Sequence, residues 1–162
     1  MINNFETLPD NSRIWIYQSN RSLSKNEIKS ISLLVENFLE DWKSHGSILS
    51  SAYEIRYNRF IIIGNNQSFQ NPTGCAIDSM VHFIQKLEKL YNITLLDKLN
   101  VSYRQGDFIA YKSLKDFKKM VKNNSVSKKT IVFNNLVQTK LEYVNNWETT
   151  AEESWHFRFF NH

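Results

Sequence analysis

Short runs of hydrophobic residues, rich in β-branched and aromatic side chains and separated by polar stretches, recur along the chain and predict strands. Residues 13–20 are rich in aromatic and β-branched side chains that alternate between two faces. Residues 47–66 contain two further runs of this kind, with a turn expected either at 58–59 or nearer 50–52. Residues 99–112 predict a hairpin, because a Gln-Gly-Asp turn divides them.

Two longer stretches instead show apolar residues at every third or fourth position, which predicts amphipathic helices. The first follows Ser24 and Glu27, whose spacing is that of a capping box, and we expect it to end at Gly46. The second is expected at 74–91.

The order of these elements is β-α-β-β-α-β with an extra strand. It predicts an α+β fold, a ferredoxin-like split βαβ sheet with two main helices, as a core domain over residues 13–112. Residues 1–12 are polar and carry a Pro-Asp-Asn turn signal, so we expect a flexible arm.

Residues 113–162 lack a long periodic run and are expected to form a small C-terminal α/β module packed on the core. A short helix is predicted at 113–124 and a strand at 128–135, followed by a segment with two tryptophans. This succession of short helix, Thr-Ile-Val-Phe strand and later tryptophan resembles small GYF-like modules.

Composition narrows the class of protein. The 162 residues are 41% hydrophobic and 22% charged, with a net charge of +4, which suits an ordinary globular chain. The single cysteine excludes an intramolecular disulfide and favours a reducing compartment. No leader-like segment and no apolar run of about 20 residues is present, so we expect a cytoplasmic protein without a membrane span.

The cysteine lies in the most chemically suggestive segment. Cys75 is expected in the first turn of the second helix, with Asp78 and His82 on the same polar arc, so these three residues are candidate catalytic groups. Cys75 and His82 would be about 10 Å apart along the axis, so a Cys-His pair would need His45 or His156. The alternative is an ordinary exposed helix face.

A second candidate site is aromatic. Trp15, Tyr17, Arg56, Tyr57 and Arg59 lie on predicted strands, where exposed rings and arginines could bind RNA or single-stranded DNA. The competing interpretation places the same rings in the core or in a subunit interface. Seven lysines between 112 and 129 are interpreted as a solvated helix face, with phosphate binding as the alternative.

Motifs for cofactors are missing from the sequence. Its four glycines give neither a G-x-x-x-x-G-K-[ST] nor a G-x-G-x-x-G pattern, and its histidines lack metal-ligand spacing. We therefore expect no cofactor and no metal site.

Five segments, RIWIYQSNR, SSAYEIRYNRFIII, GCAIDSMVHF, TIVFNNLV and SWHFRFF, together resemble a Bacteroidetes protein family of about 160 residues. Its members often carry the name "ABC transporter ATPase". That name conflicts with the sequence, because such an ATPase needs a glycine-rich phosphate loop. We expect no ATPase activity.

The leading hypothesis is a non-catalytic interaction or adaptor domain that binds a protein partner or associates with itself. The alternatives are a cysteine-dependent enzyme or redox protein using Cys75, and an RNA or single-stranded DNA binding protein.

Overall fold

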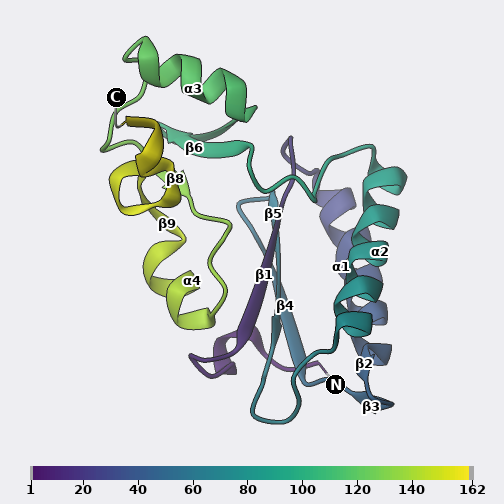
Figure 1. Cartoon of the computed structure of the whole chain (residues 1–162). Helices are drawn as coiled ribbons and strands as arrows, with labels where there is room; N and C mark the ends of the chain where they lie inside the picture. The colour runs from purple at the N-terminus through teal and green to yellow at the C-terminus, as the bar shows by residue number, and fades with distance from the viewer. Residues whose placement is uncertain (1, 161–162) are drawn as a thin grey trace.

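The computed structural model describes residues 2–160 and stacks three layers (Figure 1). Two long helices lie on one side of a three-stranded sheet, and the C-terminal part of the chain lies on the other side. Mixed helices and small antiparallel sheets confirm the α+β class.

The central sheet consists of β1 (Arg13–Gln18), β4 (Ser51–Arg56) and β5 (Phe60–Asn65), in the order β1-β5-β4. All pairings are antiparallel. The turn between β4 and β5 is formed by Tyr57 and Asn58, with φ of 53° and 56°. Two successive residues with positive φ are typical of a tight hairpin turn, so the turn begins one residue earlier than expected.

Helix α1 (Lys25–Asp41) begins with the predicted capping box at Ser24, and α2 spans Gly74–Tyr91. The first helix ends before Gly46, contrary to expectation. The chain instead forms a small hairpin of β2 (Lys43–Ser44) and β3 (Ser47–Ile48). His45 and Gly46 both have positive φ in that turn, so the glycine serves a hairpin rather than a helix end.

Both faces of the central sheet are buried. The face with Trp15 and Ile63 packs against α1 and α2, whose own contact includes the stacked rings of Phe38 and Phe83 at 4.6 Å. The opposite face, with Ile16 and Phe60, packs against the C-terminal layer. Burial on both sides explains why Phe60–Asn65 is an almost continuous apolar run.

A second sheet follows, in the order β7-β6-β8-β9. Its strands are β6 (Val101–Gln105), β7 (Phe108–Lys112), β8 (Ile131–Phe133) and β9 (Glu148–Thr150). Strand β6 was expected to belong to the ferredoxin-like sheet, but it pairs with β7 and, through Tyr103, with β8 in the second sheet. The ferredoxin-like arrangement is therefore not confirmed.

This second sheet also crosses the domain boundary expected after residue 112, because β6 pairs with β8 from the C-terminal region, while β7 pairs with β6. The remaining helices are α3 (Leu114–Lys122) and α4 (Lys140–Asn146). Three short 3-10 helices complete the chain: η1 (Phe5–Thr7), η2 (Ala151–Glu153) and η3 (Trp155–Phe160).

Residues 2–12 are packed, which corrects the expectation of a flexible arm. Phe5 and Leu8 are buried against the C-terminal layer. The ammonium of Lys140 donates to the carbonyls of Glu6 and Leu8, at 2.7 Å each. A Cβ on Gly64 would meet the side chain of Leu8 at 2.5 Å, so the segment lies directly on the sheet.

The buried amide of Gln18 joins the two sheets. Its Nε2 donates to the carbonyls of Asp97 and Asn100, at 3.0 and 2.7 Å. Its Oε1 accepts from Ser102 at 2.6 Å and from Asn135 at 2.9 Å. The side chain thereby uses both donors and both acceptor positions of its amide.

We predict that Gln18→Ala lowers the free energy of unfolding by about 2–4 kcal/mol, because several buried polar groups lose their partner together. Urea denaturation followed by circular dichroism measures the change. Gln85→Ala, at an exposed position on α2, is the control and should change stability by less than about 0.5 kcal/mol. Equal stability of the two variants would contradict a linking role for Gln18.

Candidate functional site

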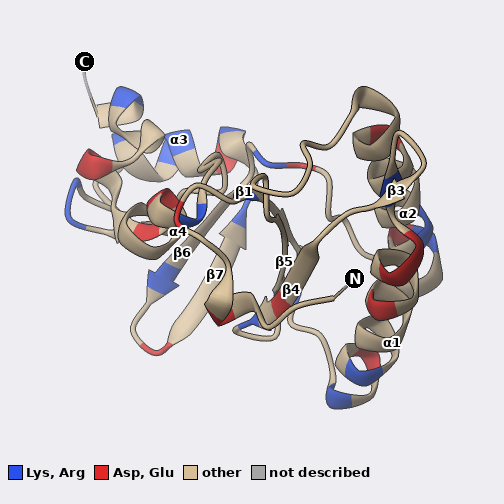
Figure 2. Cartoon of the chain, turned by 90° about the horizontal axis from the view of Figure 1, so that it is seen from below, with Lys and Arg blue, Asp and Glu red and all other residues tan. Residues whose placement is uncertain are grey.

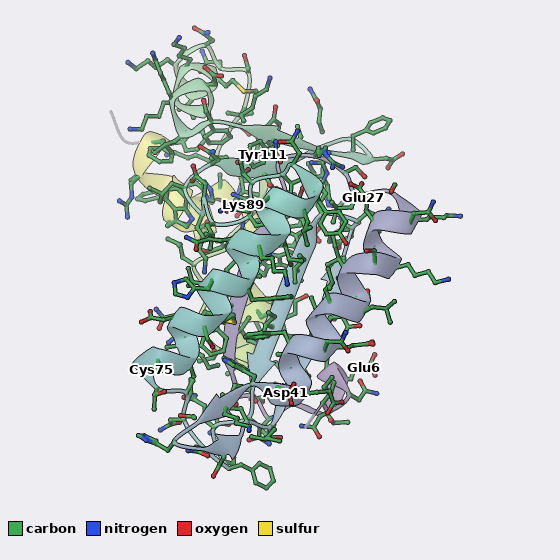
Figure 3. The ribbon with its side chains drawn as sticks, turned by 90° about the vertical axis from the view of Figure 1, so that its right-hand side faces the viewer. Glu6, Glu27, Asp41, Cys75, Lys89 and Tyr111 are labelled. Carbon is green, nitrogen blue, oxygen red and sulfur yellow. The ribbon has the colours of Figure 1, made fainter. Side chains whose placement is uncertain are left out.

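Cys75 lies near the N-terminal end of α2 with its side chain exposed (Figure 3). Asp78 and His82 are exposed on the same helix, as the spacing predicts. No hydrogen bond or ion pair within residues 2–160 joins these three side chains. The polar arc exists, but the structure assembles no nucleophile and base there.

Neither proposed helper histidine forms a pair with this thiol. His45 is an exposed residue in the turn between β2 and β3. His156 is buried in the C-terminal layer, where its Nδ1 is 2.7 Å from the hydroxyl of Ser154 and its ring stacks on Trp155. His162 is outside the described residues.

Trp15 and Tyr17 are buried beneath the helices, at 5% and 2% exposure. They cannot stack on bases in this fold, so the expected aromatic binding face is wrong at these two positions. Two cations cap the rings instead: Arg13 lies 5.1 Å from the ring of Trp15, and Lys98 lies 5.1 Å from that of Tyr17. Burial, with a smaller effect from Arg13, lowers the pKa of Lys98 to about 8.

The other three predicted binding residues gather where the two sheets meet. Tyr57 stays 37% exposed at the β4–β5 turn. Arg56 approaches its ring from one strand, at 5.0 Å, and Arg104 from β6, at 4.9 Å. The arrangement places two guanidinium groups on one tyrosine ring, a favourable use of cation-π attraction.

Glu148 of β9 connects two of these side chains, those of Tyr57 and Arg104. Its carboxylate accepts from Arg104 and from the hydroxyl of Tyr57, each at 2.5 Å. Burial by itself would raise the pKa of Glu148, but the hydrogen bonds from Arg104 and Tyr57 outweigh it and lower that pKa. Arg104 therefore has its own counter-charge.

Arg56 is also partnered. Its guanidinium donates to the hydroxyl of Tyr143 at 3.2 Å, lies 3.7 Å from Glu54 and sits 5.5 Å from the ring of Trp147. The tyrosine hydroxyl in turn donates to Glu54 at 3.0 Å. Arg56 is thus part of the contact between β4 and α4.

Arg59 differs from these two arginines. Its Nη1 is buried with no hydrogen-bond acceptor in the described part of the chain, and burial lowers the pKa of its guanidinium. No carboxylate in residues 2–160 lies within ion-pair distance of it. A partly desolvated cation without a counter-charge lowers the stability of the fold.

A groove of about 350 Å³ passes over Arg59. The β4–β5 turn forms one wall and the β6–β7 hairpin the other, where Phe108 is 78% exposed. The residues that line it are Ser22, Tyr57, Asn58, Arg59, Arg104, Asp107, Phe108 and Ile109. The groove thus offers apolar rings, an unpaired cation and one carboxylate.

Sequence reasoning missed Arg104 and Phe108 as members of this site. Phe108 had a local signal, since a large aromatic side chain directly follows the Gly-Asp turn. Arg104 had none, because its place depends on β6 joining the second sheet.

The lysines of α3 form a separate feature. Lys115, Lys118, Lys119 and Lys122, with Leu114, surround a hollow of about 460 Å³. Lys and Arg residues lie on α3 and also on α1 and α2 (Figure 2).

Within residues 2–160 no group of three or more His, Cys, Asp or Glu side chains could hold a metal ion. None of the described helices is both long and apolar enough to cross a bilayer.

Comparison of the chain with family models, with curated proteins and with solved structures found no match. The family resemblance seen in the sequence therefore stays a prediction.

We predict a loss of stability in mild acid that depends on His156. Burial, with a smaller effect from Arg158, lowers the pKa of its imidazole from 6.5 to about 4. Between these values the unfolded chain binds a proton that the folded chain does not. Stability should therefore be complete above pH 6.5 and decrease toward pH 4, by about 2 kcal/mol between pH 7 and pH 5.

Urea denaturation at the two pH values measures this loss. His156→Phe should remove most of the pH-dependent part, whatever its effect on stability at pH 7. His82→Gln, on the exposed face of α2, should retain it. The same pH dependence in the His156 variant would contradict the assignment.

We also predict that Arg59→Met raises the free energy of unfolding by about 0.5–1 kcal/mol, because it removes an unpaired, partly desolvated charge. Arg56→Met should lower stability, since that guanidinium has hydrogen-bond partners. Thermal unfolding of both variants tests the contrast, and destabilisation by Arg59→Met would show that the guanidinium has a structural role.

Proposed function

We propose that this chain is a non-catalytic cytoplasmic interaction domain that binds an acidic segment of a protein partner. The groove between the β4–β5 turn and the β6–β7 hairpin is the binding site. The observation that carries the proposal is the buried guanidinium nitrogen of Arg59, which lacks an acceptor and lies beside exposed aromatic rings.

The chemistry of the groove defines the ligand. A carboxylate, from an acidic side chain or a chain end, would form an ion pair with the guanidinium of Arg59, which lines the groove and has no ion-pair partner within residues 2–160. An adjacent apolar side chain would pack between Tyr57 and Phe108, since these rings already line the groove. Asp107 at the hairpin turn would accept an N–H from the bound segment.

Two features support binding rather than catalysis. Arg104 is hydrogen-bonded to Glu148, and Arg56 lies against the ring of Trp147, so these groups support the groove wall. The polar side chains near Cys75 are not joined to one another.

Single-stranded nucleic acid is the second candidate ligand. The lysine-lined hollow on α3 favours it, because phosphate groups bind clustered lysines. The burial of Trp15 and Tyr17 removes two of the stacking positions expected for it.

Selection of twelve-residue peptides from a random displayed library on the immobilised protein tests the proposal. We expect the selected peptides to share a carboxylate beside an apolar residue. For one such synthetic peptide, Arg59→Met and Phe108→Ser should each raise Kd at least about tenfold, as for central residues of an interface.

Lys89→Met and Leu90→Ser are the matched controls, because both positions are exposed on α2. They should leave Kd unchanged. Failure to select any peptide, or equal losses in the controls, would contradict the proposal. Salt-dependent binding of a twelve-nucleotide oligothymidylate that needs the α3 lysines would instead favour the nucleic-acid candidate.

A further inference from the structure

The outer edge of β4 is only partly covered. Strand β4 is at one end of the central sheet, and among the described strands it pairs with β5 alone. Residue Ile2 forms a parallel bridge to Ser51, and the N–H of Asn3 donates to the carbonyl of Ser51 at 2.7 Å. The N-terminal segment therefore begins a further strand on this edge.

This additional pairing with β4 ends after residue 3. Asn4 caps η1, and the chain turns away from β4. Because the carbonyl of Ser51 points outward, the N–H and C=O groups of Tyr53 and Ile55 point outward too. Within residues 2–160 these four groups have no hydrogen-bond partner along the open edge.

A groove of about 510 Å³ lies beside these free groups. Its walls come from the N-terminal segment, from Ile28 and Ser32 of α1, and from β4 itself. The N-terminal segment lies close to β4 (Figure 2). The groove runs along the strand edge, so an extended chain fits it better than a compact ligand.

The polar groups around the groove define the charge of its occupant. Glu6 and Glu54 line it, and Glu36 is nearby because it accepts from the hydroxyl of Tyr53 at 2.7 Å. Glu6 and Glu36 have no cationic partner in the described chain, although the protein as a whole carries a net charge of +4.

We infer that the open edge of β4 binds an extended, basic peptide segment of a partner protein as an added strand. The segment continues the parallel pairing that residues 2–3 begin, and bonds to the free groups of Tyr53 and Ile55. Successive side chains of a strand point to opposite faces. A basic side chain therefore points toward Glu6 and Glu54, and the next, apolar one points toward Ile28.

This surface is separate from the groove over Arg59 and prefers the opposite charge. The two binding events can therefore be tested independently, and the failure of one does not imply the failure of the other.

The test uses the full chain and a labelled hexapeptide of alternating Lys and Val, acetylated and amidated at its ends. We expect binding by fluorescence anisotropy with a Kd on the order of 100 µM, as for short extended peptides with small interfaces. The matching Glu-Val hexapeptide should not bind. Amide hydrogen exchange of Tyr53 and Ile55 should slow on addition of the Lys-Val peptide.

Two variants decide the mode of binding. Ile55→Pro removes an outward N–H that no strand uses, so it should leave the fold intact and abolish binding. Glu6→Lys reverses one exposed charge and should weaken binding at least about fivefold. Glu40→Lys, on the exposed side of α1, is the matched control and should bind like the native chain.

Several results would overturn the inference. These are no binding at 1 mM peptide, unchanged exchange at Tyr53 and Ile55, or equal binding by Glu6→Lys and the native chain. If Ile55→Pro does not fold, the comparison of peptide binding by Glu6→Lys and Glu40→Lys still tests the inference. Arg59→Met should bind the Lys-Val peptide normally, which separates this surface from the proposed acidic-ligand site.

Discussion

The two sheets depend on one buried amide for their relation to each other. Gln18 ends the first strand of the central sheet, and its side chain bonds to β6, to the loop before it and to Asn135. Asn135 extends this hydrogen-bond network to Trp147, because its Oδ1 accepts from Trp147 Nε1 at 2.9 Å. A buried amide without hydrogen-bond partners would lower the stability of the fold. This network therefore favours one relative placement of the two sheets over all others. The groove over Arg59 exists only in that placement.

Much of the first sheet and its helices could be predicted from the sequence, because local signals determine them. The capping box at Ser24 and the hydrophobic period after it define α1, and short runs of β-branched and aromatic residues define β1, β4 and β5. The partner of β6 could not be predicted, since a short strand with one buried face fits either sheet. The packing of residues 2–12 could not be predicted from the sequence either, because Phe5 and Leu8 are buried only where the C-terminal layer covers the same face.

The candidate site was predictable in part for the same reason. Arg56, Tyr57 and Arg59 are close in sequence on one hairpin, so their proximity needed no tertiary information. Trp15 was assigned to the same surface, but α1 and α2 cover its face of β1, and the C-terminal layer covers the other face. The opposite wall of the groove comes from the β6–β7 hairpin, which reaches this place only through the second sheet.

The burial of both faces of the central sheet has a consequence for synthesis of the chain. Gln18 bonds to Asn135, which is 117 positions further on, and Trp147 covers the same sheet face. During translation the sheet and its two helices can form first. The apolar face with Ile16 and Phe60 then stays exposed for several seconds, until the C-terminal layer has been synthesised. Such late, distant contacts slow folding. The nascent chain therefore exposes an apolar surface, which chaperones would bind until the last third of the protein has emerged.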